Sequence, residues 1–203
     1  MKTKKHTDPS LAQARRDQVL CAAADCFRRK GYHSAGMAEI SRTAGMSAGH
    51  IYNYFDSKEA IIESIIEKDM EEMFSIFKQF EDHPSDVLTA ILDSVHVGVE
   101  RHMDPSSCVT DLDMLAEAGR NDKVATLLRN SDTKARARMR DLLISDKSLL
   151  KGNSDEEIDS RINVIFSVMA GLLIRKVLYP ELKEETVIIA LRPAMKTLLM
   201  PFE

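Results

Sequence analysis

The segment Gly45-Met46-Ser47-Ala48-Gly49 contains residue types that could support covalent chemistry. It fits the Gly-x-Ser-x-Gly pattern in which a serine is the nucleophile of a hydrolase. Such a serine must sit on a sharp strand-to-helix turn, because only that turn exposes its hydroxyl. Residues 38–44 have a helical pattern, and no strand of a parallel sheet is predicted. We therefore expect no enzyme and no catalytic residue, with a Ser47 hydrolase as an alternative.

The cysteines and histidines do not form a metal-binding or disulfide pattern. The chain has three cysteines, Cys21, Cys26 and Cys108, and six scattered histidines. An odd number of cysteines without paired spacing fits a reducing compartment, and the absence of Cys-x-x-C gives no support to structural zinc. We interpret Cys21 and Cys26 as small hydrophobic residues. The sequence predicts neither a metal nor any other cofactor.

The charges are distributed unevenly along the chain. The net charge is −4, but residues 1–58 carry ten Lys and Arg against five Asp and Glu, and the remaining residues carry 18 against 27. A basic N-terminal segment on an acidic remainder suggests that a polyanion binds the N-terminal segment alone.

Length and hydropathy indicate a folded chain without a membrane span. The 203 residues are 44% hydrophobic and 30% charged, which is enough apolar content for a buried core. The longest uncharged stretch, 162–174, is 13 residues, whereas a span needs about 20. No apolar run follows the basic N-terminus, so we expect a cytoplasmic protein that does not bind a membrane.

Helical periodicity covers most of the chain, and strand signals are scarce. The fold class predicted is all-α with about nine helices. A single helix is expected to carry the apolar stripe from Val87 to Val99. The expected helices are at about 12–30, 37–44, 48–55, from 57 past Phe80, from 87 to about 103, 111–118, 121–144, 155–179 and 183–200.

Two of these predicted helices, 37–44 and 48–55, form a helix-turn-helix. Glycine at position 45 supplies the positive φ that a tight turn between helices needs. Ser47 can cap the second helix. The shared core is expected to consist of Met37, Ile40, Met46, Ile51 and Phe55. The second helix is short enough to lie in the major groove of DNA.

The same region resembles the TetR/AcrR family of bacterial one-component repressors. The resemblance covers residues of about 12–62, and beyond it only the number of helices agrees. The motifs that carry it are Arg16-x-x-Val19-Leu20-x-Ala22-Ala23-x-x-Cys26-Phe27-x-x-x-Gly31-Tyr32 and Ile40-x-x-x-Ala44-Gly45-Met46-Ser47-x-Gly49-x-Ile51-Tyr52-x-Tyr54-Phe55-x-Ser57-Lys58-Glu59.

This resemblance implies two domains and a homodimer. Residues 1–56 would be a three-helix DNA-binding head with a basic arm at 1–11, and residues 57–203 a helical effector-binding and dimerisation domain. The dimer would bind a palindromic double-stranded operator as a repressor and leave it when a small-molecule effector binds. A mixture of methionine and acidic residues suggests a multidrug or biocide sensor for an efflux gene. A helical interaction module without a DNA role is a further alternative.

The resemblance also assigns DNA contacts. Ala38 and Ala48 stand where the family often has longer polar side chains, and Gly36 replaces the usual hydroxyl N-cap. Base reading would then depend on His50 and Asn53, with close backbone approach at Gly49. The full set of expected DNA contacts is Gly36, Ala38, Ser47, Ala48, Gly49, His50, Tyr52, Asn53, Tyr54 and Lys58.

Two further sets of residues belong to the predicted effector-binding and dimerisation domain. The expected effector pocket is bordered by Met70, Met73, Phe74, Phe77, His96, Asp113, Met114, Glu117, Phe166 and Met169. The expected dimer interface, on the last two helices, consists of Ile162, Ile165, Leu172, Leu173, Val187, Leu191 and Leu198.

Overall fold

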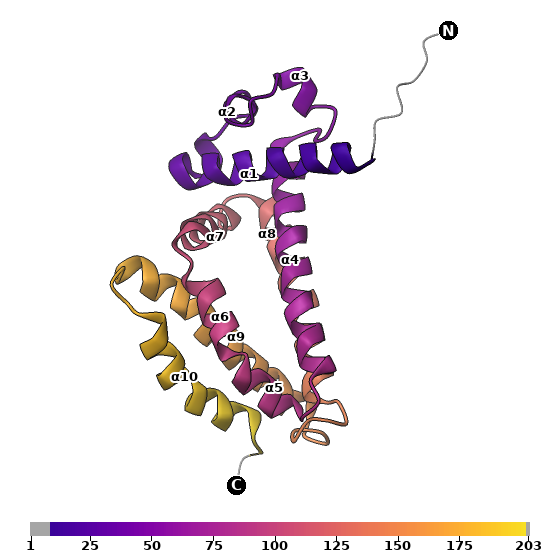
Figure 1. The fold of residues 1–203 in the computed structure, drawn as a ribbon, viewed down its shortest axis with the longest axis vertical. Helices are drawn as coiled ribbons and strands as arrows, with labels where there is room; N and C mark the ends of the chain where they lie inside the picture. The colour runs from indigo at the N-terminus through magenta and orange to yellow at the C-terminus, as the bar shows by residue number, and fades with distance from the viewer. Residues whose placement is uncertain (1–8, 202–203) are drawn as a thin grey trace. The chain divides into compact units, whose positions relative to one another are not determined.

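The computed structural model describes residues 9–201, and within that range it contains helices and no strand (Figure 1). The predicted all-α class is confirmed, with ten helices instead of about nine. Residues 1–8, most of the predicted basic arm, lie outside the described residues. The helices are α1 (Pro9–Ser34), α2 (Met37–Thr43), α3 (Ala48–Ile51), α4 (Lys58–Asp82), α5 (Val87–Asp93), α6 (Val95–Met103), α7 (Pro105–Ala118), α8 (Asp122–Leu143), α9 (Asp155–Leu178) and α10 (Glu184–Leu199).

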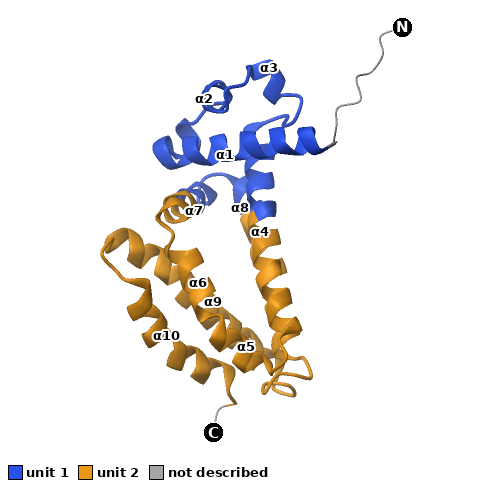
Figure 2. Ribbon diagram, in the orientation of Figure 1, with its two compact units in different colours: residues 1–68, 113–127 blue, residues 69–112, 128–203 orange. Residues whose placement is uncertain are grey.

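The chain divides into two compact units (Figure 2). Unit 1 comprises residues 1–68, described from residue 9, together with 113–127; unit 2 comprises 69–112 and 128–203. Unit 1 therefore contains the described part of the predicted head, the first turns of α4, and parts of α7 and α8. The predicted division between residues 56 and 57 concerns function, and it stays a prediction.

Helix α1 contributes a buried apolar face to the core of unit 1. Val19, Ala23 and Phe27 lie on its buried face, at most 1% exposed, as the 3.6-residue periodicity predicts. The helix is interrupted at Gly31, whose φ of 77° and ψ of 154° are far from helical values. Gly31 closes the regular helix because glycine adopts positive φ without the steric cost of a Cβ.

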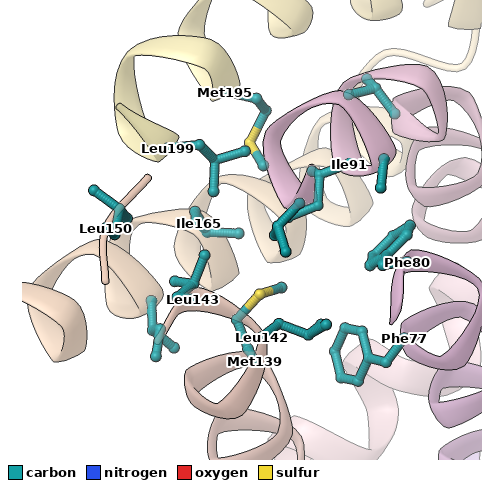
Figure 3. Close-up of a cluster of buried hydrophobic side chains, with 14 of the residues drawn as sticks. Phe77, Phe80, Ile91, Met139, Leu142, Leu143, Leu150, Ile165, Met195 and Leu199 are labelled. Atoms are coloured by element: carbon teal, nitrogen blue, oxygen red, sulfur yellow. The ribbon is translucent and has the colours of Figure 1, made fainter. Parts of the chain in front are cut away.

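The core of unit 2 gathers apolar side chains from helices distant in sequence (Figure 3). Helices α6 and α9 cross closely, since a Cβ built on Gly98 would lie 2.6 Å from the Met169 Cε. The buried side chains labelled in the close-up are Phe77, Phe80, Ile91, Met139, Leu142, Leu143, Leu150, Ile165, Met195 and Leu199.

The single helix expected from Val87 to about residue 103 is wrong. Ser94, with φ of −102° and ψ of 9°, separates α5 from α6. Both helices pack against α10. The sequence does not reveal the break at Ser94, because the helical spacing of apolar residues is the same before and after it.

A buried guanidinium joins α9 to the end of α10. Arg161 is 2% exposed, and its NH1 donates hydrogen bonds of 2.7 Å to the carbonyl oxygens of both Leu198 and Met200. Its NH2 lies 2.8 Å from the Glu157 carboxylate. The last carbonyls of a helix have no partners within it, and a cation is favourable beside them. Arg161 therefore caps α10 from within the core.

Replacing Arg161 by methionine should lower the free energy of unfolding by roughly 2–3 kcal/mol, because carbonyls held by a charged donor lose their partner. Chemical denaturation of the full chain measures this. The matched control is Arg192→Met, since Arg192 is exposed on α10. Equal stability of the two variants would contradict the capping role of Arg161.

Candidate DNA-binding site

The turn between α2 and α3 has the geometry that its residues predict. Gly45 has φ of 64°, and the Ser47 hydroxyl accepts a hydrogen bond of 3.2 Å from the His50 N–H. Ile40 and Ile51 are fully buried and Phe55 is 2% exposed. The predicted turn and cap are therefore confirmed, and the two short helices form a helix-turn-helix. Three of the five predicted core residues are buried, whereas Met37 and Met46 are half-buried.

The second helix is shorter than predicted. It covers Ala48–Ile51 instead of 48–55, and hydrogen-bonded turns follow. The Asn53 N–H donates to the His50 carbonyl at 3.2 Å and the Tyr54 N–H to the Ile51 carbonyl at 2.8 Å. These two bonds span three residues instead of four, although the Phe55 N–H still bonds the Ile51 carbonyl at 3.0 Å. The regular α-helix therefore gives way to tighter turns after one turn.

The surface of α3 and its turn is polar and exposed. Tyr52 is 50% exposed, and its neighbour Asn53 is also exposed. The His50 and Tyr54 rings stack with their centroids 5.5 Å apart, and His50 Nε2 lies 3.3 Å from the Tyr54 hydroxyl. The other expected contacts that are exposed are Gly36, Ala38, Ser47, Ala48 and Gly49.

Arg16 fixes this surface from α1. Its NH1 donates to the Tyr54 carbonyl at 2.9 Å, and its guanidinium carbon lies 4.5 Å from the centre of the Phe55 ring. Arg16 belongs to the motif that carries the family resemblance. Its place in that motif was the available signal, and only the structure identifies its partners.

Lys58, the last of the expected DNA contacts, is engaged within unit 1. Its ammonium donates to the Tyr32 carbonyl at 2.7 Å and to the His33 carbonyl at 3.3 Å, and it lies 4.2 Å from the centre of the Tyr32 ring. Burial lowers the pKa of Lys58 below its usual value. The expected phosphate contact is therefore a partly buried cation with partners of its own.

The residues predicted to border an effector pocket divide between the units. In unit 2, Met70 and Phe77 are buried in the apolar interior, and His96 is exposed with Nδ1 3.0 Å from the Asp93 carbonyl. The remaining unit 2 members are partly buried against the core cluster: Met73, Phe74, Phe166 and Met169.

The three unit 1 members lie on α7, and two of them make polar contacts. The Asp113 carboxylate accepts the Tyr32 N–H, Met114 is buried, and Glu117 lies 2.8 Å from Arg120 Nε. Unit 1 also has an open, polar cavity of about 610 Å³, and Glu117 is the one predicted pocket residue that lines it. The predicted effector pocket stays a prediction.

Most of the residues expected at a dimer interface are in the core of unit 2 instead. Ile162, Ile165, Leu173 and Leu191 are at most 7% exposed within one chain. The rest of the predicted set is partly buried against the same core: Leu172, Val187 and Leu198. Helices α9 and α10 expose other apolar side chains, which helical periodicity alone does not distinguish from the buried ones: Val164 45%, Ile174 48%, Val177 43%, Leu178 65% and Ile189 74%.

The fold and this site define an all-helical protein with a helix-turn-helix near its N-terminus. The family model for bacterial regulatory proteins of the tetR family matches residues 19–65, which include α2, the turn and α3. The helix-turn-helix region of this chain is therefore similar to the tetR family of bacterial regulatory proteins.

Curated regulators are similar to this chain over part of its length. The HTH-type transcriptional regulator UidR of Escherichia coli K12 is 31% identical over 125 residues, 59% of either protein. The HTH-type transcriptional repressor KstR2 of Mycolicibacterium smegmatis is 27% identical over 51% of this chain and 56% of its own length. The matches thus span somewhat more than half of these relatives.

Solved structures share the whole fold. Salmonella enterica GusR superposes with a TM-score of 0.77 at 24% identity, covering 97% of this chain and 99% of its own. The fatty acid degradation regulator FadR of Bacillus halodurans gives 0.73 at 22% identity, covering 96% of each chain.

No helix within residues 9–201 combines the length and apolar character that crossing a membrane requires.

Two glycines near the turn should respond oppositely to alanine. Gly45→Ala places a Cβ at φ of 64° and should lower the free energy of unfolding by about 1 kcal/mol or more. Gly49 is helical and a Cβ there meets nothing within 4 Å, so Gly49→Ala should raise it by roughly 0.5–1 kcal/mol. Chemical denaturation compares the pair, and a stabilising Gly45→Ala would contradict the assigned turn.

Proposed function

We propose that this protein is a ligand-responsive transcriptional repressor that binds a palindromic double-stranded operator as a homodimer in the cytoplasm. The observation that carries the proposal is the exposed polar surface at α3, held on an apolar core by Ile51 and Phe55. A helix of this kind can enter the major groove and present its side chains to base edges.

The serine hydrolase alternative has no support from the geometry. Ser47 lies between two helices, and its hydroxyl accepts a backbone N–H at the start of α3. A nucleophile elbow needs a strand on its N-terminal side, whereas α2 occupies that position. The alternative of a helical module without a DNA role leaves the exposed polar surface of α3 unexplained.

The proposed division of labour on DNA follows from side-chain chemistry. The Asn53 amide can both donate to and accept from an adenine edge, and the His50 ring can bond a base through a nitrogen. Tyr52 suits the phosphate backbone, which carries no sequence information. Gly49 allows the backbone to approach the duplex, because no side chain projects from it.

The proposed dimer uses the exposed side of α9 and α10. Ile174 and Ile189 are 48% and 74% exposed, and the exposed apolar residues on α9 recur at 164, 174, 177 and 178. A two-fold dimer buries the same patch on both subunits, and a palindromic operator requires this symmetry.

The proposed effector is a small molecule with higher affinity for the state that does not fit the operator, since only a difference in affinity shifts such an equilibrium. Methionine side chains adapt to varied apolar ligands, which favours a lipophilic effector and an efflux gene as the regulated target. Thermal-shift measurement with lipophilic cations tests this, and the absence of stabilisation by any of them would remove its basis.

Substitutions of base-reading residues and of backbone-contacting residues should have different effects in binding selections. His50→Ala and Asn53→Ala should change which sequences are enriched from a randomised duplex pool, because each good base contact discriminates by roughly 1–3 kcal/mol. Tyr52→Ala should weaken binding to all sequences alike. Selection followed by mobility shift at fixed salt measures both effects.

The control for the amide deletion is Asn130→Ala, since Asn130 is exposed on α8 and is not one of the expected DNA contacts. It should leave the enriched sequences and the affinity unchanged. If all four variants lost affinity equally on every duplex, the assignment of base contacts to α3 would be wrong.

The dimer face is tested by charge insertion. The double variant Ile174→Glu and Ile189→Glu should sediment as a monomer at micromolar concentration, because each dimer would bury four unpaired carboxylates. Leu115→Glu is the control, since Leu115 is 58% exposed on α7. Sedimentation velocity reports the outcome, and a double variant that stays dimeric would exclude this face.

A further inference from the structure

The end of α1 leaves backbone carbonyls in need of donors. Gly31 interrupts the helix, and residues 32–34 continue from it toward Met37, where α2 begins. A carbonyl at the end of a helix has no N–H four residues ahead to bond. The carbonyls of Tyr32 and His33 instead accept hydrogen bonds from Lys58, at 2.7 and 3.3 Å.

The charge of Lys58 stabilises the end of α1 and not the start of its own helix, α4. Lys58 is the first residue of α4, where the helix dipole is positive and a cation is unfavourable. The same charge is favourable at the end of α1, where the carbonyl dipoles are negative. Two of its three N–H donors are used on carbonyls, and the Tyr32 ring lies 4.2 Å away and offers its negative face.

The segment that Lys58 holds is fixed from a second side. The Asp113 carboxylate on α7 accepts the Tyr32 N–H, and the Tyr32 side chain is 2% exposed and packs its ring 5.3 Å from that of Phe27. Charged groups facing the Lys58 ammonium are Glu59, Glu117 and Asp113, all of which favour its protonated form. The ammonium therefore belongs to a network of hydrogen bonds and packing contacts within unit 1.

We propose that Lys58 is a positioning residue: its ammonium caps the end of α1 and thereby fixes the segment that leads into α2, instead of neutralising a DNA phosphate. The expected effect of Lys58 on DNA affinity rests on the proposed DNA-binding function. The structural part of the inference stands on the contacts with Tyr32 and His33 alone.

The two roles differ in how DNA affinity depends on salt. Neutralising one phosphate releases condensed counterions, so log K falls as log salt rises, and losing that contact makes this negative slope shallower by about 0.9. Losing a positioning residue misplaces the helix-turn-helix, which lowers affinity without removing a neutralised phosphate. The slope therefore distinguishes the two roles, whereas the affinity by itself does not.

The experiment compares the full-length wild type with Lys58→Met, Lys58→Arg and the control Lys134→Met, whose lysine is exposed on α8. The probes are the duplex upstream of the protein's own gene and a random duplex of equal length, titrated between about 50 and 200 mM salt. Lys58→Met should lose roughly tenfold in affinity at every salt concentration, with a parallel slope, because charged hydrogen bonds are lost. Lys58→Arg should recover most of the affinity, since a guanidinium can still donate to both carbonyls.

A measurement without DNA keeps the inference separate from the proposed function. The Lys58 ammonium of the free wild type should give a protected NMR signal coupled to the Tyr32 and His33 carbonyls, and Lys58→Met should accelerate amide exchange at residues 32–35. Failure of the wild type to bind either duplex at low salt would end the proposed function, while the NMR measurement would still decide the cap. A salt slope shallower by about 0.9 in Lys58→Met, or an absent ammonium coupling in the wild type, would overturn the positioning role.

Discussion

The proposed DNA-binding surface depends on the burial of a few apolar side chains beneath two very short helices. Helix α2 has seven residues and α3 has four. Isolated helices shorter than about 12–15 residues are marginal in water, so these two are stabilised by packing and not by their own propensity. The burial of Ile40, Ile51 and Phe55 is therefore what allows the polar residues of α3 and of the turn after it to be presented at all.

Polar contacts then determine the orientation that the apolar core leaves open. Gln18 donates from α1 to the Ala44 carbonyl at 2.7 Å, next to the turn, and Arg16 donates to the Tyr54 carbonyl at 2.9 Å, just after α3. Hydrogen bonds are directional, whereas apolar packing tolerates small rotations. Donors from α1 thus hold both ends of the turn and α3, and in the proposed inference Lys58 does the same for the segment before α2.

Unit 2 uses the same combination of an apolar core and a directed polar contact. Helix α9 is apolar on two sides, one facing the core through Ile162 and Ile165, the other exposed through Val164 and Ile174. Arg161 is buried on the same helix and holds the end of α10 through two carbonyl oxygens. An exposed apolar side on a helix that already has a core side is the feature that supports the proposed dimer.

The sequence was sufficient where the signal is local. Gly45 requires a left-handed turn, Ser47 provides a cap through its hydroxyl, and the spacing of Ile40, Ile51 and Phe55 predicts one buried face; the structure has all three features. Where one local pattern is compatible with two structures, the sequence does not distinguish between them. The apolar stripe of α5 and α6 passes through the break at Ser94, and helix periodicity alone predicted the longer α3.

By itself, the sequence determined the helical class, the helix-turn-helix and the residues that face outward from it, because these follow from periodicity, caps and glycine φ. Only the tertiary structure decided which apolar side of α9 faces the core and which carbonyls Lys58, Arg16 and Arg161 bond. The physical reason is that these contacts join segments 25 to 39 residues apart, and a local pattern specifies a side chain's chemistry but not its distant partner.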